Sequence, residues 1–463
     1  MAAEPPGRLP PDRLAPARLP GWLAGPYRRI WALAWPSILA DLTVPLLGAV
    51  DTAVMGHLPD PAYVGAVAVG AMIFSFLYWG FGFLRMGTVG FTAQAWGRRD
   101  ADEIRAVLGR ALLLGALIAL ALLALQWPAQ RAAFAIVEAE APVEAFAATY
   151  FAIRIWDAPA TLANYAILGW MLGMQMPRRA LAVQVAINGV NILLDLLFVV
   201  HFEWGVAGVA GATVIAQYAG AVLGLVLIAG RLRALGGAWQ RDRIADLAAL
   251  AAMMRINRDI FIRTICMICA WSWFTWKGAS LGTLTLAGNA LLMNFQTFLA
   301  HGLDGFAHAT SALVGEAKGA GRRDELRRAV VAATVMAACV AVGYALVYAA
   351  AGPALLGLLT DIPELRAFAT GYLPWVVVSP LLSVWAYQLD GIFIGATRSA
   401  EMRNGMVLSL AAYAAAMWTL PQAYGNDGLW LSILIFMVAR AATLAPWYPR
   451  IERDAGAADA RQG

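Results

Sequence analysis

Long hydrophobic runs separated by short polar segments dominate this chain. Because a helix satisfies its own backbone hydrogen bonds in lipid, each run of about 20 apolar residues is a candidate transmembrane helix. Such runs begin near residues 30, 64, 104, 146, 179, 206, 256, 284, 328, 366, 403 and 428. We therefore predict an all-α integral membrane protein with twelve transmembrane helices.

The connecting segments alternate in charge along the chain. "GRRDADEIR", "PRR", "RLRALGGAWQRDR", "GRRDELRR" and "TRSAEMR" are basic, whereas "HLPDPAY", "HFEWG", "LLTDIPEL" and "PQAYGNDG" contain no Lys or Arg. The positive-inside rule places the basic segments and both termini in the cytoplasm. The net charge of +5 is thereby explained by membrane topology, and no nucleic-acid partner is expected.

Repeated glycines indicate two related halves. Gly97 and Gly321 are 224 positions apart, and the pairs Gly169/Gly391, Gly173/Gly395, Gly205/Gly425 and Gly208/Gly428 are 222 or 220 apart. Two six-helix bundles with the same orientation follow, enclosing a cavity that opens to either side as they rock. The predicted domains are a disordered tail (1–29), an N-lobe (30–230), a cytoplasmic linker (231–255), a C-lobe (256–448) and a second tail (449–463).

The first predicted helix carries two carboxylates and two prolines. A charge at the centre of a bilayer costs about 2.5 to 3.5 kcal/mol, so Asp51 and Asp41 need a function or a partner. Pro36 and Pro45 remove backbone hydrogen bonds and predict structural bends. The alternative for Asp51 is a residue that caps a helix end at the outer interface.

A polar stripe follows the fifth helix. Asn188, Asn191 and Asp195 lie at i, i+3 and i+7, which is one helical face. Thr213 and Gln217 form a possible partner stripe on the sixth helix. These oxygens could hold a proton or a small cation beside Asp51. The alternative is a structural hydrogen-bond network between helices.

Other ionisable residues also occur within or near the spans. Arg85, Arg154, Asp157 and Arg263 are expected to form intramembrane pairs or to extend to an interface, because arginine keeps its charge. Four residues of the second half could line the cavity or relay protons, or could be structural: His301, Asp304, His308 and Asp390.

The sequence lacks the usual signatures of ATP hydrolysis and of intramembrane catalysis. There is no G-x-x-x-x-G-K-[ST], no H-E-x-x-H and no G-x-S-x-G. The three cysteines all fall within apolar stretches and support neither a disulfide framework nor a zinc site. A transporter driven by an ion gradient, with no catalytic residues, metal or cofactor, is the remaining prediction.

Several segments resemble the MATE (multidrug and toxic compound extrusion) transporters, specifically the DinF type (damage-inducible protein F). They are "VPLLGAVDTAVMGHL", "VGAVAVGAMIFSFLYWGFGFLRMGTVGFTAQAWG", "NILLDLLFV", "LDGFAHA" and "LDGIFIGATRSAEMRN". The resemblance covers about residues 30–448. It implies a multidrug efflux antiporter that exchanges protons for organic, often cationic, compounds in the plasma membrane of a bacterium, the inner membrane if Gram-negative. We expect it to be a monomer.

The same resemblance assigns site residues. It implies that Asp51 is the central coupling residue and that Asn191, Asp195 and Thr213 form its N-lobe cluster, with Na⁺ as an alternative ion at the same four residues. In the predicted cycle, Asp51 binds a proton, its repulsion with Asp195 falls, and the first helix bends near Pro45 so that substrate leaves. The alternatives are a lipid-linked oligosaccharide flippase and a metabolite exporter of the wider superfamily.

Overall fold

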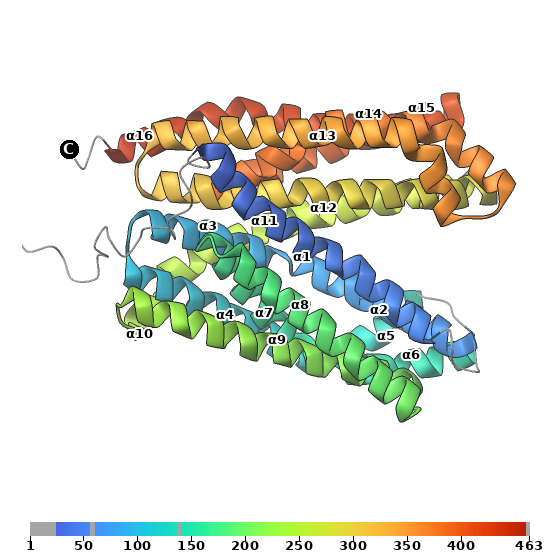
Figure 1. Ribbon diagram of the computed structural model, residues 1–463, viewed down its shortest axis with the longest axis horizontal. Helices are drawn as coiled ribbons and strands as arrows, with labels where there is room; N and C mark the ends of the chain where they lie inside the picture. The colour runs from blue at the N-terminus through green and yellow to red at the C-terminus, as the bar shows by residue number, and fades with distance from the viewer. Residues whose placement is uncertain (1–24, 56–60, 137–139, 460–463) are drawn as a thin grey trace, which may run out of the picture. The chain divides into compact units, whose positions relative to one another are not determined.

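Helices make up nearly all of the chain that the structure, a computed structural model, describes (Figure 1). It describes residues 25–55, 61–136 and 140–459, without the side chains of residues 45–47, 49–61, 136 and 457–459. No strand occurs among these residues.

The first half of the chain contains ten helices and two short irregular turns within the described ranges. They are α1 (Pro26–Met55), α2 (Pro61–Gly80), α3 (Phe83–Gly97), α4 (Ala101–Ala124), α5 (Gln126–Ile136), α6 (Ala141–Arg154), the 3₁₀ turn η3 (Ile155–Asp157), α7 (Ala158–Gly173), α8 (Pro177–Asp195), the π-helical turn η4 (Leu196–His201), α9 (Gly205–Leu235) and α10 (Arg241–Ile244).

The second half consists of longer helices. They are α11 (Leu247–Ser280), α12 (Thr283–Gly319), α13 (Arg323–Leu359), α14 (Pro363–Gly395), α15 (Ser399–Leu444), the 3₁₀ turn η5 (Ala445–Trp447) and α16 (Tyr448–Asp459). Gly425 has non-helical angles (φ 57°, ψ −130°) and divides α15 into two helices.

These helices are compatible with twelve membrane spans. Seven described segments are long and apolar enough to cross a membrane by length and composition alone. Three of the predicted spans are interrupted rather than continuous: α2 and α3 are separated by a turn at residues 81–82, α6 and α7 by η3, and α8 ends in η4. The predicted all-α membrane fold is confirmed.

The chain forms two compact units. Within the described residues, one unit contains 39–253 and the other contains 25–38 with 254–459. Helix α1 therefore contributes to both, and the change of unit falls between Pro36 and Pro45. Ile30, Leu33 and Ala34 of α1 accordingly belong to the core of the second unit.

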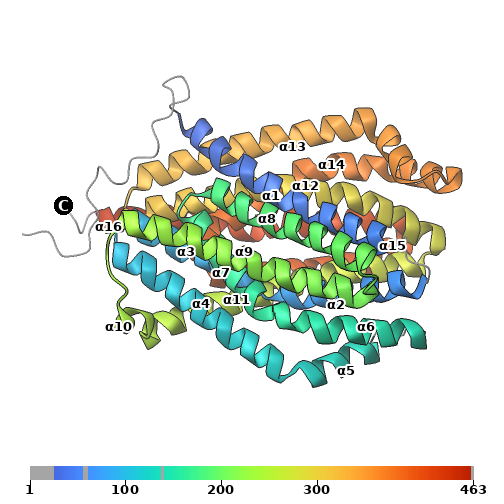
Figure 2. The ribbon, with the colours of Figure 1, turned by 60° about the horizontal axis from the view of Figure 1, so that its bottom comes forward.

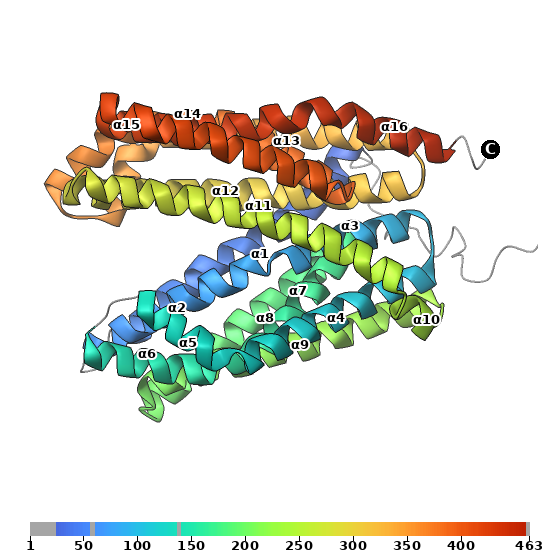
Figure 3. The same ribbon diagram turned by 180° about the vertical axis from the view of Figure 1, so that it is seen from behind.

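A central helix organises each unit. Helix α7 contacts α3, α4 and α9 in the first unit (Figure 3), and α14 contacts α12, α13 and α15 in the second. Glycines permit the closest approaches: a β-carbon on Gly169 of α7 would overlap the carbonyl oxygen of Arg85, and one on Gly391 of α14 would overlap that of Ala307. The paired glycines of the sequence thus occupy equivalent helix contacts.

Backbone conformation shows the same repeat. Left-handed residues occur at Arg99 (φ 57°) and Gly321 (φ 74°), which are 222 positions apart. Gly205 (φ 52°) and Gly425 (φ 57°) are 220 apart and open the last spans of the two units. The structural equivalent of Gly321 is therefore Arg99 and not Gly97, which explains why the predicted pair is two positions farther apart than the pairs separated by 222.

The segment after α9 is fastened to the first unit by charged groups (Figure 2). Arg105 of α4 donates from Nη2 to the carbonyl of Gly236 at 2.6 Å, and Asp102 Oδ1 accepts from the amide of Ala238 at 2.8 Å. Arg243 of α10 pairs with Asp100 at 3.0 Å, and this hydrogen bond raises the pKa of the Arg243 guanidinium. Helix α11 begins directly afterwards, at Leu247.

The glycine contact of α14 makes a testable prediction. Gly391→Ala should lower the free energy of unfolding by about 1 to 3 kcal/mol, because the added methyl meets backbone that cannot turn aside. Gly371→Ala is the matched control on the same helix, since nothing lies within 4 Å of its β-position. Thermal unfolding of the purified protein in detergent measures both. Equal melting temperatures for the two variants would contradict this account of the packing.

Candidate ion-coupling site

The predicted coupling residue of α1 lies at the limit of what the structure describes. The backbone of Asp51 is helical, within α1, but its side chain lies outside the described part of the chain, as does that of Pro45. Pro36 is buried, and α1 is helical through both prolines. The predicted bends and the role of Asp51 stay predictions.

The polar stripe of α8 is buried in the first unit. Asn191 and Asp195 have 1% and 0% of their surface exposed. The Asn191 amide donates from Nδ2 to Asp195 Oδ2 at 3.1 Å, so the two side chains form one hydrogen-bonded pair. Asn191 Oδ1 has no hydrogen-bond partner within the described residues. This pair offers several oxygen atoms to a proton or a small cation.

Asp195 occupies a special position in its helix. It is the last α-helical residue of α8, and the next six residues form the π-helical turn η4. A π turn inserts an extra residue into the helical register, and such turns often occur at functional sites. The side chains after Asp195 therefore point in different directions from those that a continuous α-helix would give them. Asn188, Asn191 and Asp195 precede the turn and lie on one regular helical face.

The same stripe also contacts α1. Asn188 donates from Nδ2 to the backbone carbonyl of Thr43 at 3.2 Å, and its Oδ1 accepts from Gln184 at 3.2 Å. Thr43 precedes Pro45 by two residues. Asn188 thus holds the α1 backbone close to the predicted bend.

The predicted partner stripe on α9 divides into two separate contacts. Thr213 is buried and donates to the Val209 carbonyl at 3.0 Å, within its own helix. Gln217 Oε1 instead accepts from Asn164 of α7 at 2.9 Å. Asn164 was missed by the sequence analysis, because a lone Asn in "LANYAI" carries no spacing signal.

Asp41 lies near a fixed cation. One oxygen of its half-buried carboxylate is 3.6 Å from Arg85 Nη1, on α3. Arginine keeps its charge, so this pair compensates an intramembrane charge that would otherwise be costly. Arg85 was expected to form an intramembrane pair or to extend to an interface, and no partner was predicted for it.

A second buried cluster joins α2, α6 and the 3₁₀ turn η3 in the first unit. Asp157 is fully buried, lies 3.5 Å from Arg154 Nε, and accepts a hydrogen bond from the Tyr78 hydroxyl. Arg154 also donates to the Tyr150 hydroxyl. The sequence predicted that Arg154 and Asp157 form intramembrane pairs or extend to an interface, without naming partners. The tyrosines were missed because aromatic residues in an apolar run look like ordinary core.

In the second unit, Asp390 lies between two arginines. Its Oδ2 accepts from Arg440 Nη2 at 2.6 Å and also from Arg263, and all three side chains are buried. The structure therefore shows a charge cluster that links α11, α14 and α15. The sequence identified Arg263 and Asp390 but did not single out Arg440.

The remaining titratable candidates of the second unit lie on α12. His301, Asp304 and His308 are each half-buried on one helix. His301 Nδ1 contacts the Thr297 carbonyl at 2.7 Å, one turn earlier in the same helix. Whether these groups relay protons stays a prediction. Among the described residues, no group of three or more His, Cys, Asp or Glu side chains is arranged to hold a metal ion.

Comparison with known proteins was made by sequence and by structure. The MatE family model matches residues 36–197 and 260–417. DNA damage-inducible protein F of Escherichia coli (strain K12) is 40% identical over 433 residues, which is 93% of each chain. Multidrug and toxin extrusion protein 1 of Oryctolagus cuniculus is 24% identical over 441 residues, covering 92% of this chain and 75% of that protein.

Solved structures share the fold. A MOP superfamily transporter from Pyrococcus furiosus superimposes with a TM-score of 0.84 at 18% identity, over 93% of this chain and 97% of that one. A crystal structure of MATE in the bent conformation gives a TM-score of 0.83 at 19% identity, over 93% and 96%. At these identities the likeness concerns the fold alone.

The arginine cluster of the second unit predicts a large effect on stability. Asp390→Asn should destabilise the protein by about 3 to 5 kcal/mol, because two buried guanidinium groups lose their shared carboxylate. The control is Asp454→Asn, which breaks the exposed pair with Arg398 and should cost no more than about 1 kcal/mol. Unfolding in detergent, followed by tryptophan fluorescence, compares the two. A loss for Asp390→Asn as small as that of the control would show that the cluster is not a structural charge pair.

Proposed function

The chain belongs to the MatE family, and from this premise we propose that it exports organic, cationic or amphiphilic compounds in exchange for protons, by alternating access between its two units. Members of this family are multidrug and toxin extrusion transporters, so the protein is a membrane transporter and not an enzyme. The earlier resemblance to MATE transporters is thereby confirmed. The coupling ion and the substrate class belong to the proposal.

One observation carries the proposal: a fully buried carboxylate contacts a neutral amide. Asp195 is 0% exposed and accepts a hydrogen bond from the Asn191 amide. An amide orients a carboxylate but does not neutralise its charge. A buried carboxylate in such a contact gains from binding a proton or a cation, which is what a coupling site requires.

Two other buried or half-buried carboxylates of these helices have arginine partners. Asp41 pairs with Arg85, and Asp390 contacts two arginines. A guanidinium compensates a carboxylate at every physiological pH, so these carboxylates gain less from a proton. We therefore give the arginine pairs a structural role and assign coupling to Asp195, which is fully buried, contacts an amide and directly precedes the π-helical turn.

Coupling follows from competition for one site. With Asp51 and Asp195 both charged, the first unit favours a lipophilic cation. When a proton neutralises Asp51, repulsion between the two carboxylates falls and α1 bends near Pro45, which expels the substrate. Asn188, which holds the α1 backbone at Thr43, connects the stripe of α8 to this bend. Substrate and proton therefore cannot occupy the site together, and antiport results.

We assign the binding of many different substrates to aromatic and methionine side chains. Aromatic faces attract cations, and methionine adapts to ligands of different shape. The chain has 18 Trp and 16 Met, which is ample material for such a surface. Sodium remains the alternative ion, since Asn191 and Asp195 supply oxygen atoms that suit either cation.

Efflux from proteoliposomes tests this proposal. A fluorescent lipophilic cation is loaded, and a pH gradient and a sodium gradient are imposed in turn. We expect the pH gradient alone to drive efflux from wild-type vesicles. Asp51→Asn and Asp195→Asn should each reduce efflux to the level of protein-free vesicles, because either change removes one of the two competing charges.

The matched control is Asp361→Asn, an exposed loop carboxylate, which should retain wild-type flux. Wild-type efflux by Asp51→Asn would contradict the coupling role of that residue. Efflux that follows only the sodium gradient would reassign the ion to Na⁺ at the same residues. A neutral analogue of the same dye, exported as fast as the cation, would contradict the charge selectivity.

A further inference from the structure

Two adjoining cavities lie at one end of the second unit. Their volumes are about 440 and 420 Å³. Both are lined by Val330 and Thr334 of α13 and by Tyr448 of α16, so they form one continuous groove, which we call the α13–α16 groove. Further lining residues of the first cavity are Arg327, Val331, Val335, Pro449 and Glu452, and of the second Trp385, Gln388, Leu389, Ile392, Val438, Ala441, Ala442 and Ala445.

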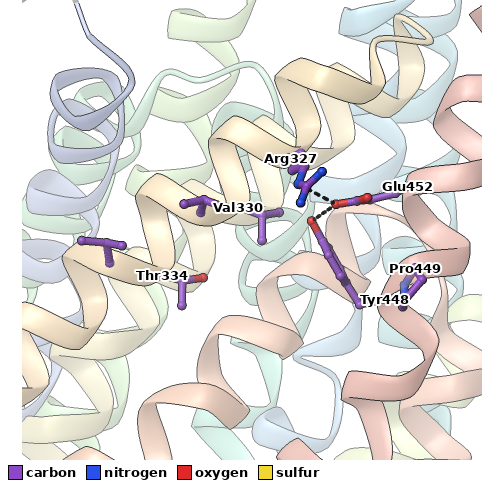
Figure 4. A pocket seen from close by; sticks show the side chains of 8 residues that line it. Arg327, Val330, Thr334, Tyr448, Pro449 and Glu452 are labelled. Atoms are coloured by element: carbon purple, nitrogen blue, oxygen red, sulfur yellow. Dashed lines mark hydrogen bonds and ion pairs between the residues drawn. The ribbon is translucent and has the colours of Figure 1, made fainter.

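The groove is polar at one end and apolar along its length. Figure 4 shows Arg327, Tyr448 and Glu452 gathered beside Pro449, with Val330 and Thr334 farther along α13. The walls of the second cavity come mainly from aliphatic residues and Trp385. A ligand that fits must therefore combine a charged head with a long apolar part.

The charge at the polar end is positive. Glu452 accepts a hydrogen bond from the Tyr448 hydroxyl at 2.7 Å, and its carboxylate lies 3.6 Å from Arg323 and 3.9 Å from Arg327. Two guanidinium groups thus share one carboxylate, which leaves one positive charge in excess. The side chains of Arg323 and Arg327 are 52% and 69% exposed, so most of their donors remain available to an anion.

The length of the groove suits a lipid chain. From Arg327 to Val335 the helix rises about 12 Å, at about 1.5 Å per residue. Half of a hydrocarbon core is about 15 Å. Helix α13 is one of the segments that can span the membrane, and Arg327 lies near its basic end. The groove therefore begins at headgroup level and runs into the depth of one leaflet.

We propose that the α13–α16 groove binds an anionic phospholipid. The phosphate pairs with Arg323 and Arg327, whose planar guanidinium groups match phosphate oxygens, and one acyl chain lies along Val330, Thr334 and Val335. Basic pockets between membrane helices recognise anionic headgroups in this way. The excess positive charge disfavours a lipophilic cation, so the groove is separate from the proposed transport site. Bound lipid would also contact α16 and hold it against α13.

Native mass spectrometry of the full chain in detergent tests the site. Dioleoyl phosphatidylglycerol is titrated against dioleoyl phosphatidylcholine, which has the same chains and no net charge. We expect the wild type to retain one phosphatidylglycerol more tightly than phosphatidylcholine. Arg327→Ala should weaken phosphatidylglycerol binding about fivefold, and the Arg323→Ala/Arg327→Ala pair about 25-fold, since each arginine near an anionic headgroup contributes about that factor.

Arg328→Ala is the charge-matched control. It removes the same charge from the next residue of the same helix, but Arg328, unlike Arg327, lines neither cavity and, unlike Arg323, forms no ion pair with Glu452, so binding should stay at the wild-type level. Equal losses for Arg327→Ala and Arg328→Ala would overturn the proposal, because they would indicate general attraction to a basic surface. Equal retention of the two lipids by the wild type would also overturn it.

The apolar part is tested by filling the groove. Thr334→Trp should abolish the retained lipid, and Val331→Trp, at a position that is 53% exposed, repeats the test where folding is less at risk. Val342→Trp, on the same helix outside both cavities, should bind as the wild type does. Unchanged lipid binding in both groove variants would overturn the proposal. So would a dimer that these variants dissociate while no lipid is retained, because the groove would then be an interface between copies.

Discussion

The cost of an unpartnered polar group in hydrocarbon is the constraint on which this structure depends. Lipid offers no hydrogen bonds, so the backbone must satisfy itself, and the described chain is helical almost throughout. The same cost applies to side chains. Arg85, Arg154 and Arg263 each have an aspartate beside them, which allows charge to exist within the two units.

Function depends on how a buried carboxylate is partnered. An arginine partner compensates the charge of a carboxylate at every physiological pH. Asp390 and its two arginines therefore link three helices as a structural charge cluster. An amide partner orients a carboxylate but does not neutralise it, and Asn191 orients Asp195 in this way. The two arrangements underlie our proposal that coupling belongs to Asp195 and that the arginine pairs are structural. The π-helical turn after Asp195 adds a local irregularity at the same place.

The two units share a packing plan and differ in chemistry. Equivalent glycines on α7 and α14 let each central helix approach its neighbour, and left-handed residues recur at nearly constant separation. These features concern the backbone, and the repeat retains them. The side chains set on that plan are different: an amide and a carboxylate on α8 in the first unit, and arginines around Asp390 in the second. A duplicated scaffold can thus support the proposed coupling site in one half and a charge cluster in the other.

The sequence by itself determined the fold class, the two halves and most of the polar residues of interest. Hydrophobic length fixes a membrane helix locally, and a glycine repeat records backbone contacts that side chains cannot replace. Helical spacing also placed Asn188, Asn191 and Asp195 on one face, because that face depends on positions within a single helix.

Only the tertiary structure decided the partners. Asn164 meets Gln217, Arg85 meets Asp41, and Tyr78 meets Asp157 across distances of 44 to 79 residues in the chain. No local pattern records which helices will be neighbours. The structure also showed that the start of α1 belongs to the second unit. It showed that helices are interrupted at η3, at η4 and at Gly425. Composition predicts that a segment crosses the membrane, but packing against its neighbours decides where its helix breaks and which charge it meets.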